Sequence, residues 1–396
     1  MAKLCHSRYT LAMTNWLSAP RVQLVCTLLL GVNILIVLAL WLTSQGGLDF
    51  GGRPLGADFL AFWNAGWLAG NNTLPLADGT LAMSDIHPLA PSGQTDVLLW
   101  TYPPPFLLLL APLAQLPYIP AMLTFTILSL ALALLAARLL TPTRWGWLVL
   151  LSAPVTLVCV LGGQTGLLVA GSIGLGFVLR RSHPWLAGLA FSLAIIKPHF
   201  AALIPLFLLL QRDDKALISM VIGVIVLCGL SWLAFGPDAW SFFLSQMPSA
   251  RLILETGAPP WAKMGSVFVT VRQLGGPLGL AWGLHLLAFT LALHWAWPVL
   301  RRADDHAVAA LLLLTMLATP YQFDYDQVLT LLALGFWARA RLGRFSRAEQ
   351  LTLLLLWLGP VLFPMIATHT QLGLMPLPLL AGLVLLKVNL SRSAPA

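Results

Sequence analysis

The stretch Leu24-Val-Cys-Thr-Leu-Leu-Leu-Gly-Val-Asn-Ile-Leu-Ile-Val-Leu-Ala-Leu-Trp-Leu42 carries no charged side chain and is interrupted by few polar ones. A run of this length is enough for an α-helix to cross the roughly 30 Å hydrocarbon core of a bilayer. It exceeds the apolar part of a signal peptide, and no A-x-A-like cleavage site follows it. We therefore expect a helix that stays in the membrane.

The rest of the chain has the same character. Of its 396 residues 59% are hydrophobic and 9% are charged, whereas soluble domains carry about 25% charged residues. Splitting the apolar runs at polar, Gly and Pro positions predicts about twelve membrane passes. We predict an all-α integral membrane protein whose residues 1–396 form a single helical bundle. The passes are expected at 22–44, 119–140, 145–162, 166–180, 185–197, 199–211, 216–235, 278–299, 306–319, 327–338, 349–366 and 372–389.

The basic residues predict the orientation of this bundle. Most of them fall at one end of the predicted passes, which the positive-inside tendency assigns to the cytoplasm together with both termini. The net charge of +8 does not indicate a nucleic-acid partner, because the basic residues stand singly or in pairs and form no patch. We expect a multi-pass protein of the bacterial inner membrane. The basic residues predicted on the outer side are Arg53, Lys197, Arg251, Lys263 and Arg272.

The outer side also receives the two long connections, 45–118 and 236–277, and most of the acidic residues, Asp78, Asp85 and Asp96 among them. Long loops without a packing role tend to carry function. The run from Pro103 to Pro117 is too short to span, so we expect a helix lying in or dipping into the outer leaflet. The four cysteines share no short spacing, and we predict no disulfide framework, metal site or cofactor.

Asp58 is the first candidate catalytic residue. It stands just ahead of Phe59, Phe62 and Trp63, which follow helical spacing. Asp is a common N-cap, so it could simply begin an interfacial amphipathic helix. Alternatively, its carboxylate could act as a general base that accepts a proton from a hydroxyl group of a bound acceptor.

Cations on the outer side are candidates for binding an anion. Lys197, close to His199, could contact a phosphate or snorkel to the interface, and the sequence leaves both open. Arg251, Lys263 and Arg272 occur together in the second long segment. They could bind a lipid phosphate or pair with acidic neighbours such as Glu255.

Three further segments carry polar side chains at predicted outer turns. Tyr102-Pro-Pro-Pro is typical of a helix start, and Gly162-Gly-Gln164-Thr-Gly is a weak signal. Asp324-Tyr-Asp326 has a spacing that can serve a divalent cation, but two carboxylates are an incomplete site. A helix cap in a solvated turn is therefore favoured for this pair.

Together these segments resemble glycosyltransferase family 87, polytopic enzymes that use polyprenyl-phosphate sugars, and the similarity extends from about residue 20 to 385. The resemblance implies a GT-C-like helical bundle and a catalytic role for Asp58. We expect Lys197, Arg251, Lys263 and Arg272 to contact the donor phosphate. Other substrate contacts are assigned to Tyr102, Gln164, His199, Asp324 and Asp326.

The expected reaction is an inverting transfer of a hexose, mannose-like, from a polyprenyl-phosphate donor to a lipid or glycan acceptor at the extracytoplasmic face. The competing hypothesis is a transporter or lipid flippase. Such a protein should show paired repeats and ionisable residues at the membrane midplane, and the sequence shows neither.

Overall fold

The computed structural model describes residues 17–71, 73, 80–81, 98–141, 144–257, 260–341 and 344–392; Asp78, Asp85 and Asp96 lie outside this part of the chain. Helices dominate the described residues, and the strands among them form one two-residue antiparallel pair, β1 (Thr80–Leu81) with β2 (Leu98–Leu99). The helices are α2 (Ala19–Thr43), α3 (Ala57–Gly70), η2 (Pro104–Phe106), α4 (Leu107–Leu113), α5 (Tyr118–Leu140), α6 (Arg144–Ser152), α7 (Pro154–Gly162), α8 (Gly166–Leu179), α9 (Pro184–Ser192), η3 (Leu193–Ile196), α10 (Pro198–Ala201), α11 (Ile204–Gln211), α12 (Asp214–Ser245), α13 (Met247–Thr256), η4 (Trp261–Lys263), α14 (Val267–Gln273), α15 (Leu278–Leu300), α16 (Asp305–Ala318), η5 (Asp324–Gln327), α17 (Val328–Arg341), α18 (Arg347–Thr370) and α19 (Pro376–Arg392), where η marks a 3-10 helix.

Within the described residues, 5 helices are long and apolar enough to cross a membrane: α2, α5, α12 continued by α13, α15 and α18. This confirms a helical membrane protein. The other predicted passes coincide with shorter or broken helices. The pass predicted at 145–162, for example, is divided at Ala153 into α6 and α7, because Pro154 cannot donate a backbone hydrogen bond to a continuing helix. Twelve complete crossings and the GT-C arrangement remain predictions.

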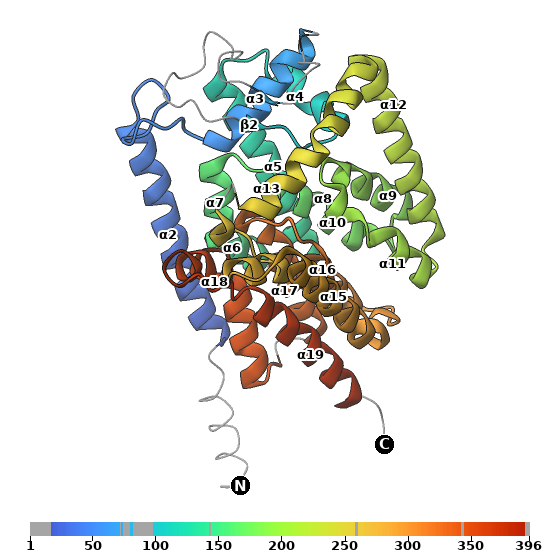
Figure 1. Cartoon of the computed structure of the whole chain (residues 1–396). Coiled ribbons are helices and arrows are strands. Elements are labelled where there is room, and N and C mark those ends of the chain that lie inside the picture. The colour runs from blue at the N-terminus through green and yellow to red at the C-terminus, as the bar shows by residue number, and fades with distance from the viewer. Residues whose placement is uncertain are drawn as a thin grey trace, which may run out of the picture.

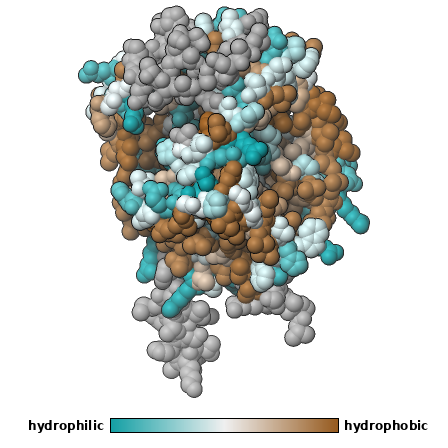
Figure 2. Space-filling model, viewed as in Figure 1, coloured by the Kyte–Doolittle hydropathy of each residue, from teal (hydrophilic) through white to brown (hydrophobic). Residues whose placement is uncertain are grey.

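The two ends of the described chain lie on the same side of the molecule. In Figure 1 the start of α2 and the end of α19 are at the lower edge, while α3 and α4 are at the upper edge. This arrangement agrees with the predicted topology, in which the termini and the first long outer segment lie on opposite sides. Figure 2, in the same view as Figure 1, shows hydrophobic surface over much of the face turned to the viewer, with hydrophilic residues gathered across its middle.

Helix α2 faces outward along most of its length. Of its residues only Cys26 is buried, and Leu24, Leu28 and Leu35 are each more than 60% exposed. Its Asn33 side chain donates a hydrogen bond of 3.1 Å to the Leu151 carbonyl of α6. Such extensive apolar exposure suits contact with lipid.

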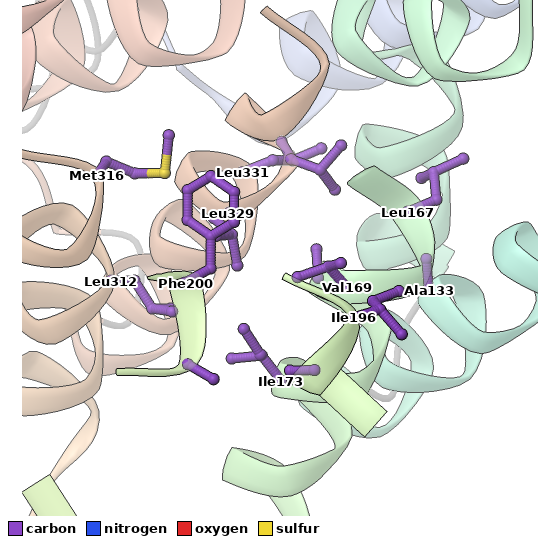
Figure 3. Packing of buried hydrophobic residues seen from close by; sticks show 14 of the residues in the cluster. Ala133, Leu167, Val169, Ile173, Ile196, Phe200, Leu312, Met316, Leu329 and Leu331 are labelled. Atoms are coloured by element: carbon purple, nitrogen blue, oxygen red, sulfur yellow. The ribbon is translucent and has the colours of Figure 1, made fainter. Parts of the chain in front are cut away.

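The core is built by helices distant in sequence. Figure 3 shows side chains from α5, α8, α16 and α17 packed around the short segment that joins η3 to α10. The core therefore holds this segment, which carries Lys197, in the interior of the bundle. The labelled core residues are Ala133, Leu167, Val169, Ile173, Ile196, Phe200, Leu312, Met316, Leu329 and Leu331.

The predicted second outer loop, 236–277, is mostly helical. Its first part is the portion of α12 that follows Gly236 (φ 70°), where a non-helical backbone conformation divides α12 into two helices just after the predicted end at 235. Glycine tolerates this left-handed φ, so the Gly236-Pro237 pair ends one helix and begins the next, close to the predicted end at 235. The run from Pro103 to Pro117 does contain the expected helix, as η2 and α4, and its Phe106 and Leu110 are fully buried.

Candidate active site

Asp58 lies in the first turn of α3 but does not cap it. The N-cap is Gly56, with no side-chain cap bond, so the interpretation of Asp58 as an N-cap is wrong. The helix is also not an interfacial one, because Phe59, Phe62 and Trp63 are buried in the core. The Asp58 side chain itself is exposed. An exposed carboxylate thus stands at the start of a helix that is otherwise mostly buried.

The turn after α7 lies directly against this carboxylate. A Cβ atom on Gly162 would come 3.0 Å from Asp58 Oδ2, and one on Gly163 (φ 67°) would come 2.6 Å from Phe59 Cβ. The two glycines therefore allow the turn to approach the start of α3. The next residue, Gln164, is buried, and its Oε1 accepts a 3.3 Å hydrogen bond from the backbone N–H of Thr165.

We expect Gly162→Ala to lower turnover about ten- to a hundred-fold, because the added methyl would displace the Asp58 carboxylate and small misplacements of catalytic groups are costly. The control is Gly229→Ala on α12, where an added Cβ meets nothing within 4 Å. Turnover and thermal unfolding would be measured for both. Parental turnover in Gly162→Ala would show that the position of this carboxylate does not matter.

Lys197 and Asp326 form a buried ion pair at the centre of the site. Lys197 Nζ lies 2.6 Å from Asp326 Oδ1, and the two side chains are 7% and 3% exposed. The second carboxylate oxygen accepts a 3.0 Å bond from the Phe323 backbone N–H. Lys197 therefore does not snorkel to an interface, and Asp326 caps a buried turn instead of the expected solvated one.

Aromatic rings surround the Lys197 ammonium. It lies 4.6 Å from the centre of the Tyr325 ring and 5.6 Å from that of Tyr102. The Tyr102 hydroxyl lies 3.3 Å from Thr165 Oγ1, which joins the Tyr102-Pro-Pro-Pro segment to the turn beside Asp58. Burial raises the pKa of Tyr102 although the nearby Lys197 charge opposes it, so the phenol keeps its proton at neutral pH.

Asp324 and Lys263 extend the site toward the second outer segment. A β-bridge between Met264 and Phe323 holds the two segments together. Burial raises the pKa of Asp324 to about 6, against the attraction of the Lys263 charge, while the Asp326 and Asp58 carboxylates raise it further. Lys263 is exposed. Asp324 therefore lies within electrostatic range of both Lys263 and Asp58.

Other predicted site residues lie in different contacts. Arg251 is 70% exposed and pairs with Glu255 at 2.8 Å. Arg272 donates to the carbonyl oxygens of Gly276 and Glu255, at 2.8 and 3.1 Å. His199 is exposed beside the ring of Phe200. Among the described residues, no hydrogen bond or ion pair joins these three side chains to Asp58 or Lys197.

The structure adds residues whose role the sequence did not single out. Tyr325 contacts Lys197 through its ring, and its carbonyl oxygen lies 3.4 Å from Cys159 Sγ on α7. Thr165 and Gly162 belong to a Gly-rich turn that gave only a weak signal. The described residues hold no group of three or more His, Cys, Asp or Glu side chains suited to a metal ion.

Comparisons with known proteins identify the family of this chain. Two curated relatives, from Mycobacterium tuberculosis strains CDC 1551 / Oshkosh and ATCC 25618 / H37Rv, are both named alpha-(1->3)-arabinofuranosyltransferase. Each is 30% identical over 250 residues, which cover 52% of this chain and 56% of the relative. The chain thus matches about half the length of these relatives. No solved structure matches. The model of glycosyltransferase family 87 matches residues 100–320, more than half of the chain, and the chain belongs to that family.

Proposed function

We propose that the protein is an inverting glycosyltransferase that moves a sugar from a polyprenyl-phosphate donor to a hydroxyl group of a lipid or glycan acceptor at the extracytoplasmic membrane face. The observation that carries this proposal is the exposed Asp58 carboxylate beside Gly162, whose charge acts on Asp324 together with that of the exposed Lys263. This arrangement offers a base and a cation in one site.

In the proposed reaction, Asp58 accepts the proton of the acceptor hydroxyl while that oxygen forms a bond to the anomeric carbon. The bond between the anomeric carbon and the donor phosphate oxygen breaks on the opposite face. The lipid phosphate leaves with the bonding electrons, and its growing negative charge is stabilised best by cations already in place. Proton, sugar and charge are then accounted for without a cofactor.

The structure suggests different roles for the predicted phosphate-binding residues. Lys263 is exposed and has no ion-pair partner within 4.0 Å among the described residues, so we assign the leaving phosphate to it first. Lys197 is neutralised by Asp326 and is proposed to position the turn that bears Asp324. Arg251 and Arg272 remain predicted phosphate contacts but are less favoured, because both already contact Glu255, Arg251 through its carboxylate and Arg272 through its carbonyl oxygen.

We expect Lys263→Ala to raise the donor KM about ten-fold, which corresponds to ~1.4 kcal/mol, because a charge-assisted contact to phosphate is lost. The matched control is Lys215→Ala, an exposed lysine at the start of α12. Steady-state kinetics at varied donor concentration would separate KM from kcat. An unchanged KM for Lys263→Ala would move the phosphate site elsewhere.

The sugar itself is part of the proposal. The sequence predicts a mannose-like hexose, whereas the curated relatives are named for an arabinofuranosyl group. Purified protein in liposomes would be given polyprenyl-phosphate mannose, polyprenyl-phosphate arabinofuranose or a nucleotide-activated mannose, with radiolabelled sugar in each. Transfer from either lipid donor alone supports the proposed donor class and names the sugar. Transfer from the nucleotide sugar alone would overturn it.

The same assay tests the transporter alternative. A flippase moves a lipid between two leaflets and forms no glycosidic bond, so it would give no glycosidic product in micelles or in liposomes. We expect the purified protein to form product in micelles as well as in liposomes. Lipid movement in liposomes without any product, under conditions where the protein is folded, would favour the alternative.

A further inference from the structure

An apolar cavity of about 470 Å³ lies between α2 and the helices α5, α6, α8, α17 and α18. This volume falls within the range of small-molecule sites. The cavity lacks the polar lining of a reaction centre, because its wall consists almost wholly of aliphatic and small side chains. Representative lining residues are Cys26, Ala137, Gly146, Leu331 and Trp357.

The cavity exists because α2 stands away from the bundle where the facing residues are small. Ala133, Ala136 and Ala137 of α5 and Ala170 of α8 line it, and none of them reaches far toward α2. Apolar cavities stay dry and bind apolar molecules, and an empty one forfeits the dispersion contacts of its walls. In a bilayer, the available apolar filler is a hydrocarbon chain.

One end of this cavity carries a cation. Arg21 is the one charged residue among those lining it, and it lies exposed in the first turn of α2. Within the described residues Arg21 has no ion-pair partner within 4.0 Å. A guanidinium at the end of an apolar slot matches a phosphate attached to a hydrocarbon chain.

We propose that this cavity binds one acyl chain of an anionic phospholipid, which enters from the leaflet on the Arg21 side and places its phosphate at Arg21. The cavity extends to Val328, the residue directly after η5, which carries Asp324 and Asp326. The bound chain therefore fills the space behind α17 and supports the turn that belongs to the active site. This site is separate from the one assigned to the sugar donor.

The test is photocrosslinking in nanodiscs that contain phosphatidylglycerol with a diazirine near the end of one acyl chain. Crosslinked peptides of the full-length protein would be mapped by mass spectrometry. We expect labelling within 133–141 and 328–338. Filling the cavity with Ala137→Phe should reduce this labelling at least five-fold. Ala131→Phe should leave it unchanged, because Ala131 is an exposed residue of the same helix that does not line the cavity.

The headgroup contact is tested with Arg21→Gln, a change on an exposed side chain that leaves packing intact. Labelling should fall in this variant and persist in Arg181→Gln, which alters an exposed arginine outside the cavity. Equal labelling of parent and Ala137→Phe, with both proteins folded by thermal unfolding, would overturn the proposal. So would labelling of these peptides by a photoreactive polyprenyl phosphate that excess phosphatidylglycerol fails to displace, since the occupant would then be the donor tail.

Discussion

Asp58→Asn is expected to reduce turnover by a factor of 10² to 10⁴, which corresponds to about 3 to 5 kcal/mol of activation free energy. Asparagine keeps the shape of the side chain but cannot accept the acceptor's proton. Because Gly56, and not Asp58, is the N-cap of α3, the substitution removes no cap. The free energy of unfolding should fall only by the interaction between a carboxylate in the first turn and the helix dipole, which is worth about 0.3 to 1 kcal/mol.

The measurement is sugar transfer under single-turnover conditions together with thermal unfolding. Asp49→Asn is a matched control, because Asp49 lies in the same outer segment but accepts hydrogen bonds from the backbone N–H groups of Gly51 and Arg53, which asparagine can also accept. We expect parental turnover in this control. Near-parental turnover in Asp58→Asn would end its catalytic assignment, and Asp324 would be the next carboxylate to test.

Asp326→Asn is expected to destabilise the protein by about 3 to 5 kcal/mol, because it leaves the buried Lys197 charge without its partner. Denaturation in detergent would measure the loss. The double change Lys197→Met with Asp326→Leu should recover much of it, since replacing a buried pair by apolar residues is often nearly neutral. Turnover should stay low in the double variant if the pair also positions the turn that bears Asp324.

The exposed pair of Arg251 and Glu255 provides the control. Breaking it with Arg251→Met should cost at most about 1 kcal/mol, because solvent screens exposed pairs. A loss in Asp326→Asn as small as that in Arg251→Met would contradict the buried character of the Lys197–Asp326 pair. Full turnover in the double variant would instead remove its positioning role.

Much of the fold could be predicted from the sequence because hydrophobic periodicity and length act locally. The long runs at α2, α5 and α15 were predicted within a few residues, since a helix in lipid must satisfy its own backbone hydrogen bonds. Breaks inside predicted passes were missed, as at Ala153, which divides the pass predicted at 145–162 into α6 and α7. Gly236 and Pro237, in contrast, predicted the end of a helix at 235, and the backbone leaves the helical conformation at Gly236.

The composition of the site was also visible in the sequence, but the pairing of its residues was not. The sequence singles out Lys197 as a cation in apolar sequence, Asp58 ahead of a helical run of aromatic residues, and Asp326 by its Asp-x-Asp spacing. Nothing local indicated that Lys197 would meet Asp326, because the two are 129 positions apart. From the sequence, Arg251 and Arg272 were as good candidates for the donor phosphate as Lys197, because contacts between distant residues cannot be read locally. The structure places both arginines at Glu255.

The sequence by itself indicated a membrane protein and the positions of its long helices, because these follow from the hydrophobicity of short segments. The distribution of charge along the chain likewise predicted an outer side that carries most acidic residues and a few basic ones. Only the tertiary structure decided which carboxylate is free and which is neutralised. Asp58 stays exposed because two glycines bring a distant turn up to it without covering it. Asp326 is buried against Lys197 because the core closes around both. Burial and pairing are properties of the packed bundle, and those properties separate the proposed general base from the buried ion pair.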